Sequence, residues 1–159
     1  SFGTLDEASW NGVMNQDSNY MAQAMALAKQ AGELGEVPVG AVIVMNNQII
    51  ARAHNLTETL NDVTAHAEMQ AFTAAADFLG GKYLKDCELY VTLEPCQMCA
   101  GASYWTQIGK IVYGASDPER GFRNLKTRLH PKTKVVSGIL ENECSQLLKR
   151  FFVEKRNLN

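Results

Sequence analysis

Apolar residues along the chain follow a helical period first and a strand-like pattern afterwards. In residues 20–34 they recur at helical spacing, which predicts an amphipathic helix. Residues 37–44 form a nearly continuous apolar run, which is typical of a strand buried on both faces. Asn46-Asn47 then predicts a two-residue turn into a partner strand over residues 48–53. The fold is therefore expected to begin with a helix and an antiparallel hairpin.

After the hairpin, helical and strand-like segments alternate. Further helices are predicted over residues 65–79, from Pro95 onward and over residues 141–156. Further strands are predicted over residues 88–92, 110–113 and near 135–136. This order indicates a three-layer α/β/α sandwich built on a mixed sheet of about five strands.

Length and composition indicate one compact domain. At 159 residues and 46% hydrophobic, the chain has enough apolar surface to fold without disulfides, and its four cysteines suit a reducing compartment. No apolar run is long enough for a membrane span, and no signal peptide is visible. We expect a cytoplasmic protein with its domain over residues 18–159, preceded by a flexible leader or cloning remnant over residues 1–17.

The net charge of −2 hides a segregation of charge along the chain. Residues 1–118 carry five Lys or Arg and thirteen Asp or Glu, whereas residues 119–159 carry ten and four. Such asymmetry indicates that the C-terminal region meets a polyanion. The alternative interpretation is a solvated loop and helix face.

Two short motifs hold the residue types of a metal site. One contains His66 and Glu68, and the other contains Cys96 and Cys99 as a CxxC pair. Three ligands, the histidine and both cysteines, leave a tetrahedral Zn²⁺ one position for water, which marks a catalytic site. Glu68 is then placed to move protons without binding the metal.

The expected local structure brings the two motifs together. Thr64 is predicted to cap the helix that carries the histidine and the glutamate in its first turn. Pro95 is predicted at the first position of the helix that carries both cysteines, which then share a face. Both helix N-termini would point at the metal and favour thiolates at neutral pH.

Other interpretations of the cysteines are a redox pair or a structural zinc. A redox CxxC needs no nearby histidine and glutamate. A structural zinc needs a fourth ligand, and Cys87 lies before its strand, at the far end of the sheet from the metal. We expect Cys87 and Cys144 to be small buried apolar residues.

The metal motifs match the H-x-E…P-C-x-x-C signature of zinc-dependent nucleobase deaminases. This signature does not select a substrate, but longer segments narrow the match: Val37–Val42, Ala53–Leu56, Thr64–Glu68, Thr92–Ala102, Ile108–Ala115 and the final helix through Phe151-Phe152. Over residues 20–156 the chain resembles the bacterial tRNA-specific adenosine deaminases of the cytidine deaminase superfamily.

The resemblance implies hydrolysis of the wobble adenosine (position 34) of a tRNA anticodon to inosine, with release of ammonia. It implies one Zn²⁺ per subunit, held by His66, Cys96 and Cys99, with Glu68 transferring protons. The residues expected to contact the substrate are Asn55, Val39, Ala41, Asp117 and Phe152.

The resemblance also implies a homodimer, with the helix after Cys99 at the interface, and an anticodon stem-loop against the basic C-terminal region. The candidates for contact with the RNA backbone are Arg120, Arg123, Lys149, Arg150, Lys155 and Arg156. The loop over residues 117–124 departs from the family pattern, because it lacks the usual Gly-Ser pair and is shorter by about half a dozen residues.

Two other classes of protein remain as alternatives. A deaminase of a free nucleobase or nucleoside, such as guanine, cytosine or cytidine, would share the metal site and need no polyanion surface. Tyr104-Trp105 is also similar to the free-guanine deaminases, although this pair could equally pack against a partner subunit. A non-catalytic RNA-binding subunit is disfavoured, because such subunits lose the catalytic glutamate that is present here as Glu68.

Overall fold

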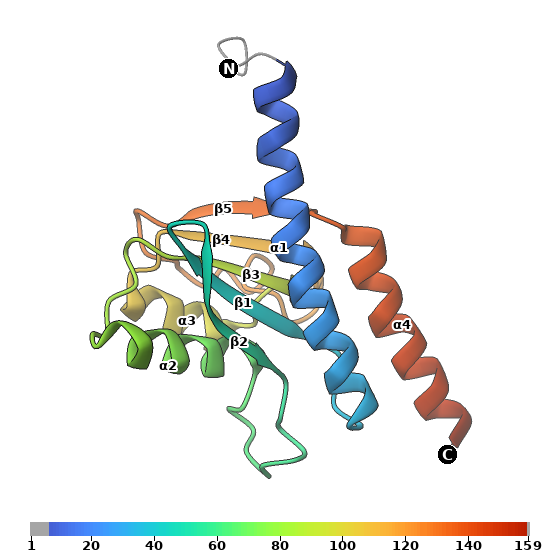
Figure 1. Ribbon diagram of the computed structural model, residues 1–159. Coiled ribbons are helices and arrows are strands. Elements are labelled where there is room, and N and C mark those ends of the chain that lie inside the picture. The colour runs from blue at the N-terminus through green and yellow to red at the C-terminus, as the bar shows by residue number, and fades with distance from the viewer. Residues whose placement is uncertain (1–6, 159) are drawn as a thin grey trace.

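A five-stranded mixed sheet forms the centre of the molecule (Figure 1). The computed structural model describes residues 7–158, and their side chains from residue 16 onward. The strands lie in the order β2-β1-β3-β4-β5, with β1 antiparallel to both of its neighbours and β3, β4 and β5 parallel. Their bounds are β1 Gly40–Met45, β2 Gln48–His54, β3 Glu88–Leu93, β4 Lys110–Ala115 and β5 Lys134–Ser137.

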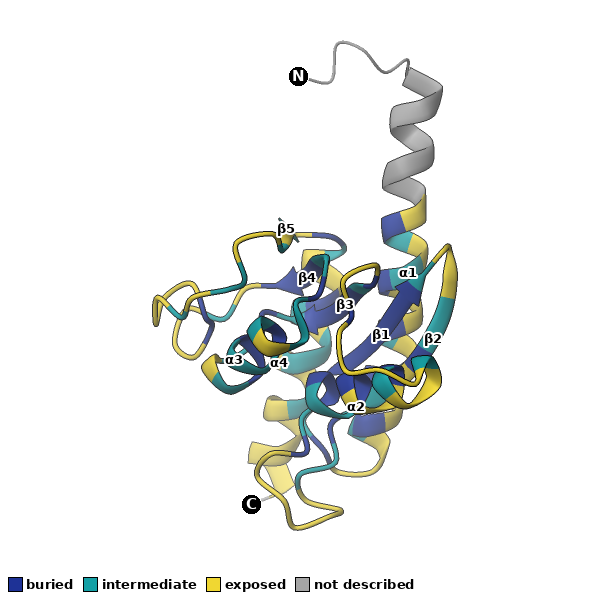
Figure 2. Ribbon diagram, turned by 90° about the vertical axis from the view of Figure 1, so that its left-hand side faces the viewer, coloured by how far each residue is buried: buried dark blue, intermediate teal, exposed yellow. Residues whose placement is uncertain are grey.

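Four helices cover the two faces of the sheet. Helices α2 (Ala67–Leu79) and α3 (Gln97–Thr106) contact each other on one face, and α1 (Glu7–Glu33) and α4 (Glu141–Leu158) contact each other on the other face (Figure 1). Buried residues gather in the sheet between these layers (Figure 2). The predicted three-layer sandwich with a mixed five-stranded sheet is confirmed. No helix in the described part of the chain is both long and apolar enough to cross a bilayer.

The central strands are apolar throughout because each face of the sheet has its own core. In β1, Ala41 and Ile43 belong to the core under α2 and α3, whereas Val42 and Val44 belong to the core under α1. A strand with period-two side chains and helices on both faces has no position left for polar residues. This packing explains the continuous apolar run in the sequence.

The hairpin between β1 and β2 turns at Asn46 and Asn47, as the sequence predicts. Their φ angles are 51° and 62°, in the left-handed region that asparagine tolerates better than most residues. Two consecutive residues with positive φ form the type I′ turn, whose twist suits a hairpin.

The first helix begins earlier than the predicted residue 20. Helix α1 starts at Glu7, and its residue Asp17 is buried. The carboxylate of Asp17 accepts a hydrogen bond from the Tyr90 hydroxyl at 2.8 Å and lies 3.7 Å from the Lys110 ammonium. The helix therefore runs through most of the segment interpreted as a leader, and residues 1–6 lie outside the described part.

Candidate metal centre and substrate pocket

Two of the three predicted ligands occupy equivalent positions at the ends of facing helices. His66 is the N-cap of α2, with φ −70° and ψ 154°, and Cys96 is the N-cap of α3, with φ −73° and ψ 174°. An N-cap residue has extended backbone geometry while its side chain lies over the first turn. Cys99 follows in the first turn of α3. The two helix N-termini thus deliver all three side chains to one point.

Both helices begin later than the sequence predicts. Thr64 does not cap α2, because its backbone N–H and its hydroxyl both donate to the Asp62 carboxylate, at 2.8 Å and 2.7 Å. This local turn keeps Thr64 outside the helix, as expected for a short polar side chain that offers the backbone an alternative partner. In the same way Pro95 precedes the N-cap of α3 instead of occupying its first position.

The separations between the three ligands fit a tetrahedral zinc ion. Nδ1 of His66 lies 3.6 Å from Sγ of Cys96 and 3.6 Å from Sγ of Cys99. A tetrahedral ion with Zn–S of about 2.3 Å and Zn–N of about 2.0–2.1 Å requires a sulfur–nitrogen separation of about 3.6 Å. The residues present therefore match Zn²⁺ in both ligand type and spacing.

No fourth protein ligand belongs to this cluster within the described residues. The ligand atoms of His66, Cys96 and Cys99 all lie within 4.8 Å of one another, and no other His, Cys, Asp or Glu there joins them. Cys87 packs in the core under α2 and α3, and Cys144 packs in the core under α1, as predicted for buried apolar cysteines. Three protein ligands with a position left for water are typical of catalytic zinc.

The electrostatics of the cluster favour a thiolate at one cysteine. The thiol of Cys99 donates to Cys96 and lowers the pKa of Cys96 to about 4, although burial opposes this shift and His66 assists it. The pKa of Cys99 is raised correspondingly, first by its hydrogen bond to Cys96 and then by burial. The N-termini of α2 and α3 add positive partial charge beside both sulfurs.

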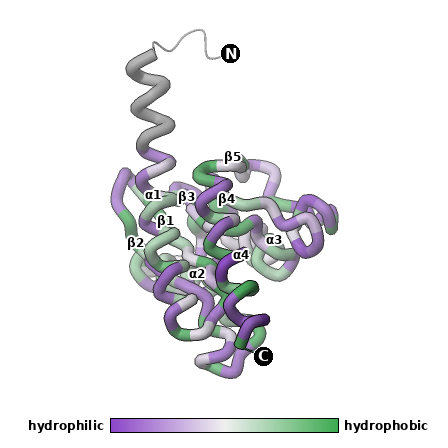
Figure 3. The backbone as a smooth tube through the Cα atoms, turned by 90° about the vertical axis from the view of Figure 1, so that its right-hand side faces the viewer, coloured by the Kyte–Doolittle hydropathy of each residue, from purple (hydrophilic) through white to green (hydrophobic). Residues whose placement is uncertain are grey.

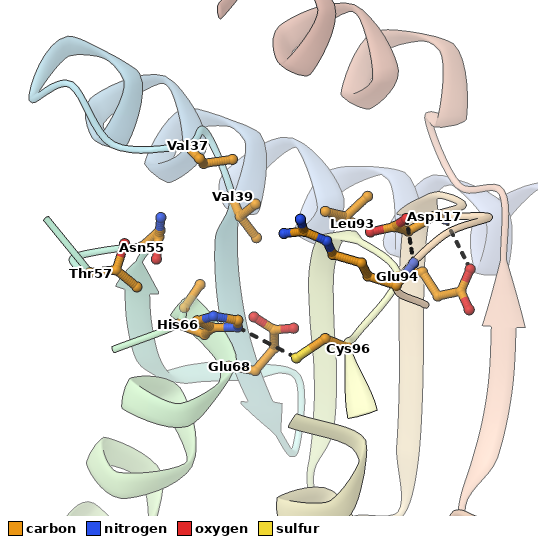
Figure 4. Close-up of a pocket in the computed structure, with 12 residues that line it drawn as sticks. Val37, Val39, Asn55, Thr57, His66, Glu68, Leu93, Glu94, Cys96 and Asp117 are labelled. Atoms are coloured by element: carbon orange, nitrogen blue, oxygen red, sulfur yellow. Dashed lines mark hydrogen bonds between the residues drawn. The ribbon is translucent and has the colours of Figure 1, made fainter. Parts of the chain in front are cut away.

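Glu68 lies beside the cluster in the first turn of α2. Its side chain is 4% exposed, and burial raises its pKa to about 7. A carboxyl group with a pKa close to neutrality can both accept and return a proton at physiological pH. Figure 4 shows the Glu68 carboxylate between His66 and Cys96, facing the cavity.

A cavity of about 260 Å³ opens above the cluster. This volume is just below the range of about 300–1,000 Å³ that is usual for ligand pockets, and it suits one planar base better than a larger molecule. The pocket is lined by Val37, Val39, Asn55, Thr57, His66, Ala67, Glu68, Leu93, Glu94, Cys96, Asp117 and Arg120. The segment before β1, the segment after β2, the start of α2, the end of β3 with the turn that follows it, and the loop after β4 therefore meet at one site (Figure 4).

The structure brings some of the predicted substrate residues to this pocket and not others. Val39, Asn55 and Asp117 line it. Ala41 does not, because it lies two residues further into the sheet, where the core under α2 and α3 covers it completely. Phe152 is 46% exposed on α4 and is not a lining residue either.

The predicted RNA-binding cations also fall into separate groups. Arg120 lines the pocket. Arg123 is engaged within the protein, since its guanidinium donates to the Tyr113 hydroxyl at 3.1 Å. Hydrophilic residues recur along α4 (Figure 3). The predicted cations on this helix are exposed: Lys149, Arg150, Lys155 and Arg156.

Sequence reasoning missed two buried carboxylates that hold the walls of the pocket. Glu36 is fully buried and accepts four hydrogen bonds from residues 57–59. Glu94 is 5% exposed and accepts hydrogen bonds from the loop after β4. The sequence did offer one signal, which is that each glutamate lies close to the end of an apolar strand. An ionisable residue buried there needs hydrogen-bond donors from another segment of the chain.

Comparisons with known proteins agree with this site. The family model for the cytidine and deoxycytidylate deaminase zinc-binding region matches residues 14–115. The tRNA-specific adenosine deaminase of Bacillus subtilis is 50% identical over 149 residues, which cover 90% of this chain and 92% of that protein. The tRNA-specific adenosine deaminase of Aquifex aeolicus is 46% identical over 144 residues, which cover 87% of this chain and 95% of that protein.

Solved structures give the same result for the fold. A structure from a study of A-to-I editing by tRNA:A34 deaminases superposes with a TM-score of 0.75 at 42% identity, covering 82% of this chain and 99% of that chain. A guanine deaminase from Bacillus subtilis superposes with a TM-score of 0.59 at 42% identity, covering 62% of this chain and 63% of that chain. With its three-ligand zinc site, the chain belongs to the cytidine and deoxycytidylate deaminase family, and within it to the group of tRNA-specific adenosine deaminases.

Proposed function

We propose that the protein hydrolyses the wobble adenosine (position 34) of a tRNA anticodon to inosine and releases ammonia. The observation that carries this proposal is the buried Glu68 beside the three-ligand cluster, at the base of a cavity sized for one base. The similarity to tRNA-specific adenosine deaminases over most of the chain supports adenosine in tRNA as the substrate.

The reaction exchanges the exocyclic amine of adenine for an oxygen from water. Zn²⁺ held by His66, Cys96 and Cys99 would lower the pKa of a bound water towards neutrality. Glu68 accepts one proton from the attacking water and delivers it to the ring nitrogen beside the carbon under attack. It then passes the second proton to the amine, which leaves as ammonia. A carboxyl pKa of about 7 suits both transfers.

Asn55 is proposed to recognise the base. It is 7% exposed and lines the pocket. Among the described residues no hydrogen bond engages its side-chain amide, so the NH₂ group and the carbonyl oxygen stay available to a bound base. Val39 is proposed to form an apolar wall against the face of the ring, which its place in the pocket supports.

The exposed cations of α4 are proposed to contact the RNA backbone outside the pocket. A target base in a single-stranded anticodon loop can leave its stack at small cost and enter a closed site. Its neighbours then remain on the protein surface, where basic side chains can reach phosphates. Action on tRNA also supports our proposal that the protein is cytoplasmic.

A homodimer is proposed because α3 carries a large exposed apolar residue. Trp105 is 77% exposed on α3, and its ring stacks edge-on with Tyr104 at a centroid distance of 5.8 Å. Large exposed aromatic residues are typical of protein–protein contact surfaces. Sedimentation equilibrium tests this proposal, and a monomer of 17.5 kDa at micromolar concentration would contradict it.

The activity is tested by comparing substrates with the zinc-loaded protein. One arm uses an anticodon stem-loop with adenosine at the wobble position, and the other arm uses free guanine, cytosine, adenosine and cytidine. We expect inosine in the stem-loop and no turnover of the free compounds. Turnover of a free base or nucleoside with inert RNA would contradict the proposed substrate and favour the free-nucleobase alternative.

The role of Glu68 is tested in the same assay with Glu68→Gln. We expect kcat to fall by about 10²–10⁴-fold, because a general acid–base contributes that much, while the zinc content stays at one per chain. The matched control is Glu143→Gln, which removes the same charge from an exposed position on α4. Loss of zinc in Glu68→Gln would make the carboxylate a ligand and contradict the proposed role.

A further inference from the structure

The side chain of Glu94 joins the metal-ligand turn to the loop that follows β4. Its Oε1 accepts the backbone N–H of Asp117 at 3.0 Å, and its Oε2 accepts the backbone N–H of Arg123 at 3.0 Å. The carboxylate is 5% exposed, so solvent does not compete for these bonds. Glu94 is two residues before the ligand Cys96, and the loop it holds supplies Asp117 and Arg120 to the pocket wall.

Two other contacts hold the same loop against the same turn, and a third holds it against β4. The backbone N–H of Phe122 donates to the carbonyl of Pro95 at 2.9 Å, and Cys96 forms a β-bridge with Gly121. The ring of Phe122 is 6% exposed and stacks edge-on with Tyr113 at 6.1 Å. These contacts hold the loop in one conformation beside the turn that carries Cys96.

The close approach of Glu94 requires a glycine opposite it. A Cβ atom added at Gly121 would overlap the Glu94 carboxylate and would also come too close to the carbonyl of Asp117. The φ angle of Gly121 is not in the left-handed region, so this glycine is required by space and not by backbone conformation. The loop and the carboxylate thus fit one another like packed core residues.

We propose that Glu94 is a positioning residue, which clamps residues 117–123 to the metal-ligand turn and so fixes the part of the pocket wall that recognises the nucleotides flanking the target base. The proposal rests on the proposed function. Asp117 and Arg120 lie on this clamped loop and line the pocket. If a base is inserted into the pocket, the nucleotides on either side of it would stay outside, next to this loop. Held in place, a carboxylate and a guanidinium can select hydrogen-bonding edges and phosphate positions.

The direct test is Glu94→Gln, which keeps the shape of the side chain and replaces one acceptor oxygen with an NH₂ group. That group faces a backbone N–H, so one of the two anchors is lost whichever way the amide turns. We expect the amide protons of Asp117 and Arg123 to exchange faster with solvent in the variant, as measured by NMR. The matched control is Glu119→Gln, an exposed acid on the same loop, which should leave this exchange unchanged.

The kinetic test separates positioning from a general structural role. With anticodon stem-loops that differ in the nucleotides beside the wobble adenosine, we expect Glu94→Gln to raise KM about tenfold and to reduce the preference among these stem-loops. The value of kcat should change little, because the loop carries side chains that would bind the RNA and does not touch the reacting atoms. Zinc content and Tm should stay near the wild-type values.

A second substitution reaches the same contact from the opposite side. Gly121→Ala should reproduce the phenotype of Glu94→Gln, and the double variant should be no worse than the more severe single variant, because both disrupt one contact. Gly81→Ala is the control, since its Cβ would meet no heavy atom within 4 Å. Additive effects of the two substitutions would contradict a shared clamp.

The outcomes distinguish failure of this proposal from failure of the proposed function. Unchanged amide exchange and unchanged flanking preference in Glu94→Gln would overturn the clamp. Loss of zinc or a large fall in Tm with an unchanged preference would also overturn it, because Glu94 would then support the metal turn or the fold alone. If the wild type leaves every stem-loop unmodified, the proposed function fails, and the exchange of Asp117 and Arg123 still decides whether the clamp exists.

Discussion

Glu36 is a buried carboxylate that binds the loop over residues 57–59, on the side of the pocket opposite Glu94. Its Oε1 accepts the backbone N–H of Glu58 at 3.1 Å and the Thr57 hydroxyl at 3.4 Å. Its Oε2 accepts the backbone N–H and the hydroxyl of Thr59 at 2.7 Å and 2.6 Å. This loop follows Asn55 and contains Thr57, and both residues line the pocket. The carboxylate therefore supports the proposed base-binding side of the site.

We predict that Glu36→Gln lowers the free energy of unfolding by about 2 kcal/mol at pH 7. The remaining carbonyl oxygen can keep the two shorter bonds to Thr59, and the new NH₂ group then faces the N–H of Glu58. One backbone donor loses its acceptor, and a hydrogen bond to a charged group contributes about 1.5–3 kcal/mol. A change of about 2 kcal/mol is roughly thirtyfold in the unfolding equilibrium constant.

The effect should depend on pH in one direction. Burial raises the pKa of Glu36, but the hydrogen bonds from Thr59, Glu58 and Thr57 together outweigh burial and lower it below its ordinary value of 4.5. The stabilisation is therefore complete above the unfolded-state pKa and is lost as the pH falls through the lower native pKa. The difference between wild type and Glu36→Gln should shrink once the pH falls below about 4.5, the ordinary pKa of the carboxyl group.

Urea unfolding followed by circular dichroism at pH 7 and at acid pH measures this difference. With a slope of about 2 kcal/mol/M, the midpoint at pH 7 should fall by about 1 M. Glu58→Gln is the matched control, since the Glu58 side chain is exposed on the same loop and should give no shift. An equal loss of stability at both pH values, or none at pH 7, would refute the charged hydrogen bonds as the cause.

Two further predictions concern regions outside the pocket. Replacing Lys149, Arg150, Lys155 and Arg156 with glutamine should weaken stem-loop binding and reduce the slope of log K against log[salt] by about 3, at about 0.7 for each lost contact; binding titrations at several salt concentrations measure it, and an unchanged slope would mean that α4 does not face RNA. Tyr90→Phe should lower the free energy of unfolding by about 1–3 kcal/mol, because the carboxylates of Asp17 and Glu88 lose its hydroxyl donor. Thermal unfolding tests the second prediction, and an unchanged Tm would show that this contact does not anchor α1.

The sequence predicted the metal ligands well because their signals are local. A CxxC pair needs only one turn of helix to bring its sulfurs together, and His66 with Glu68 requires only a neighbouring helix start. The sequence misplaced both helix starts by two residues. For α2 the reason is that the sequence could not reveal that Thr64 would donate to Asp62. The difference matters chemically, because in the structure His66 and Cys96 are N-cap residues, whereas the prediction put them within the helices.

Composition and periodicity were less informative where no sheet surface lies beneath a helix. The first turns of α1 extend past the sheet in Figure 1, and their sequence is only weakly periodic, so no clear amphipathic pattern indicates a helix there. In the same way, Val39 and Ala41 look alike in the sequence, as two small apolar residues of one predicted strand. Both pack in the core under α2 and α3, and only the tertiary structure shows that Val39, just before the strand begins, also reaches the pocket.

The sequence by itself determined the order of elements, the three-layer architecture and the identity of the zinc ligands, because periodicity, turn residues and ligand spacing are properties of short segments. Tertiary structure alone decided how Glu36 and Glu94 hold the loops on opposite sides of the pocket. Their partners are 21–23 and 23–29 residues away in the chain, and no local pattern specifies such a pairing. A buried carboxylate needs donors, and only the folded chain brings those donors to it.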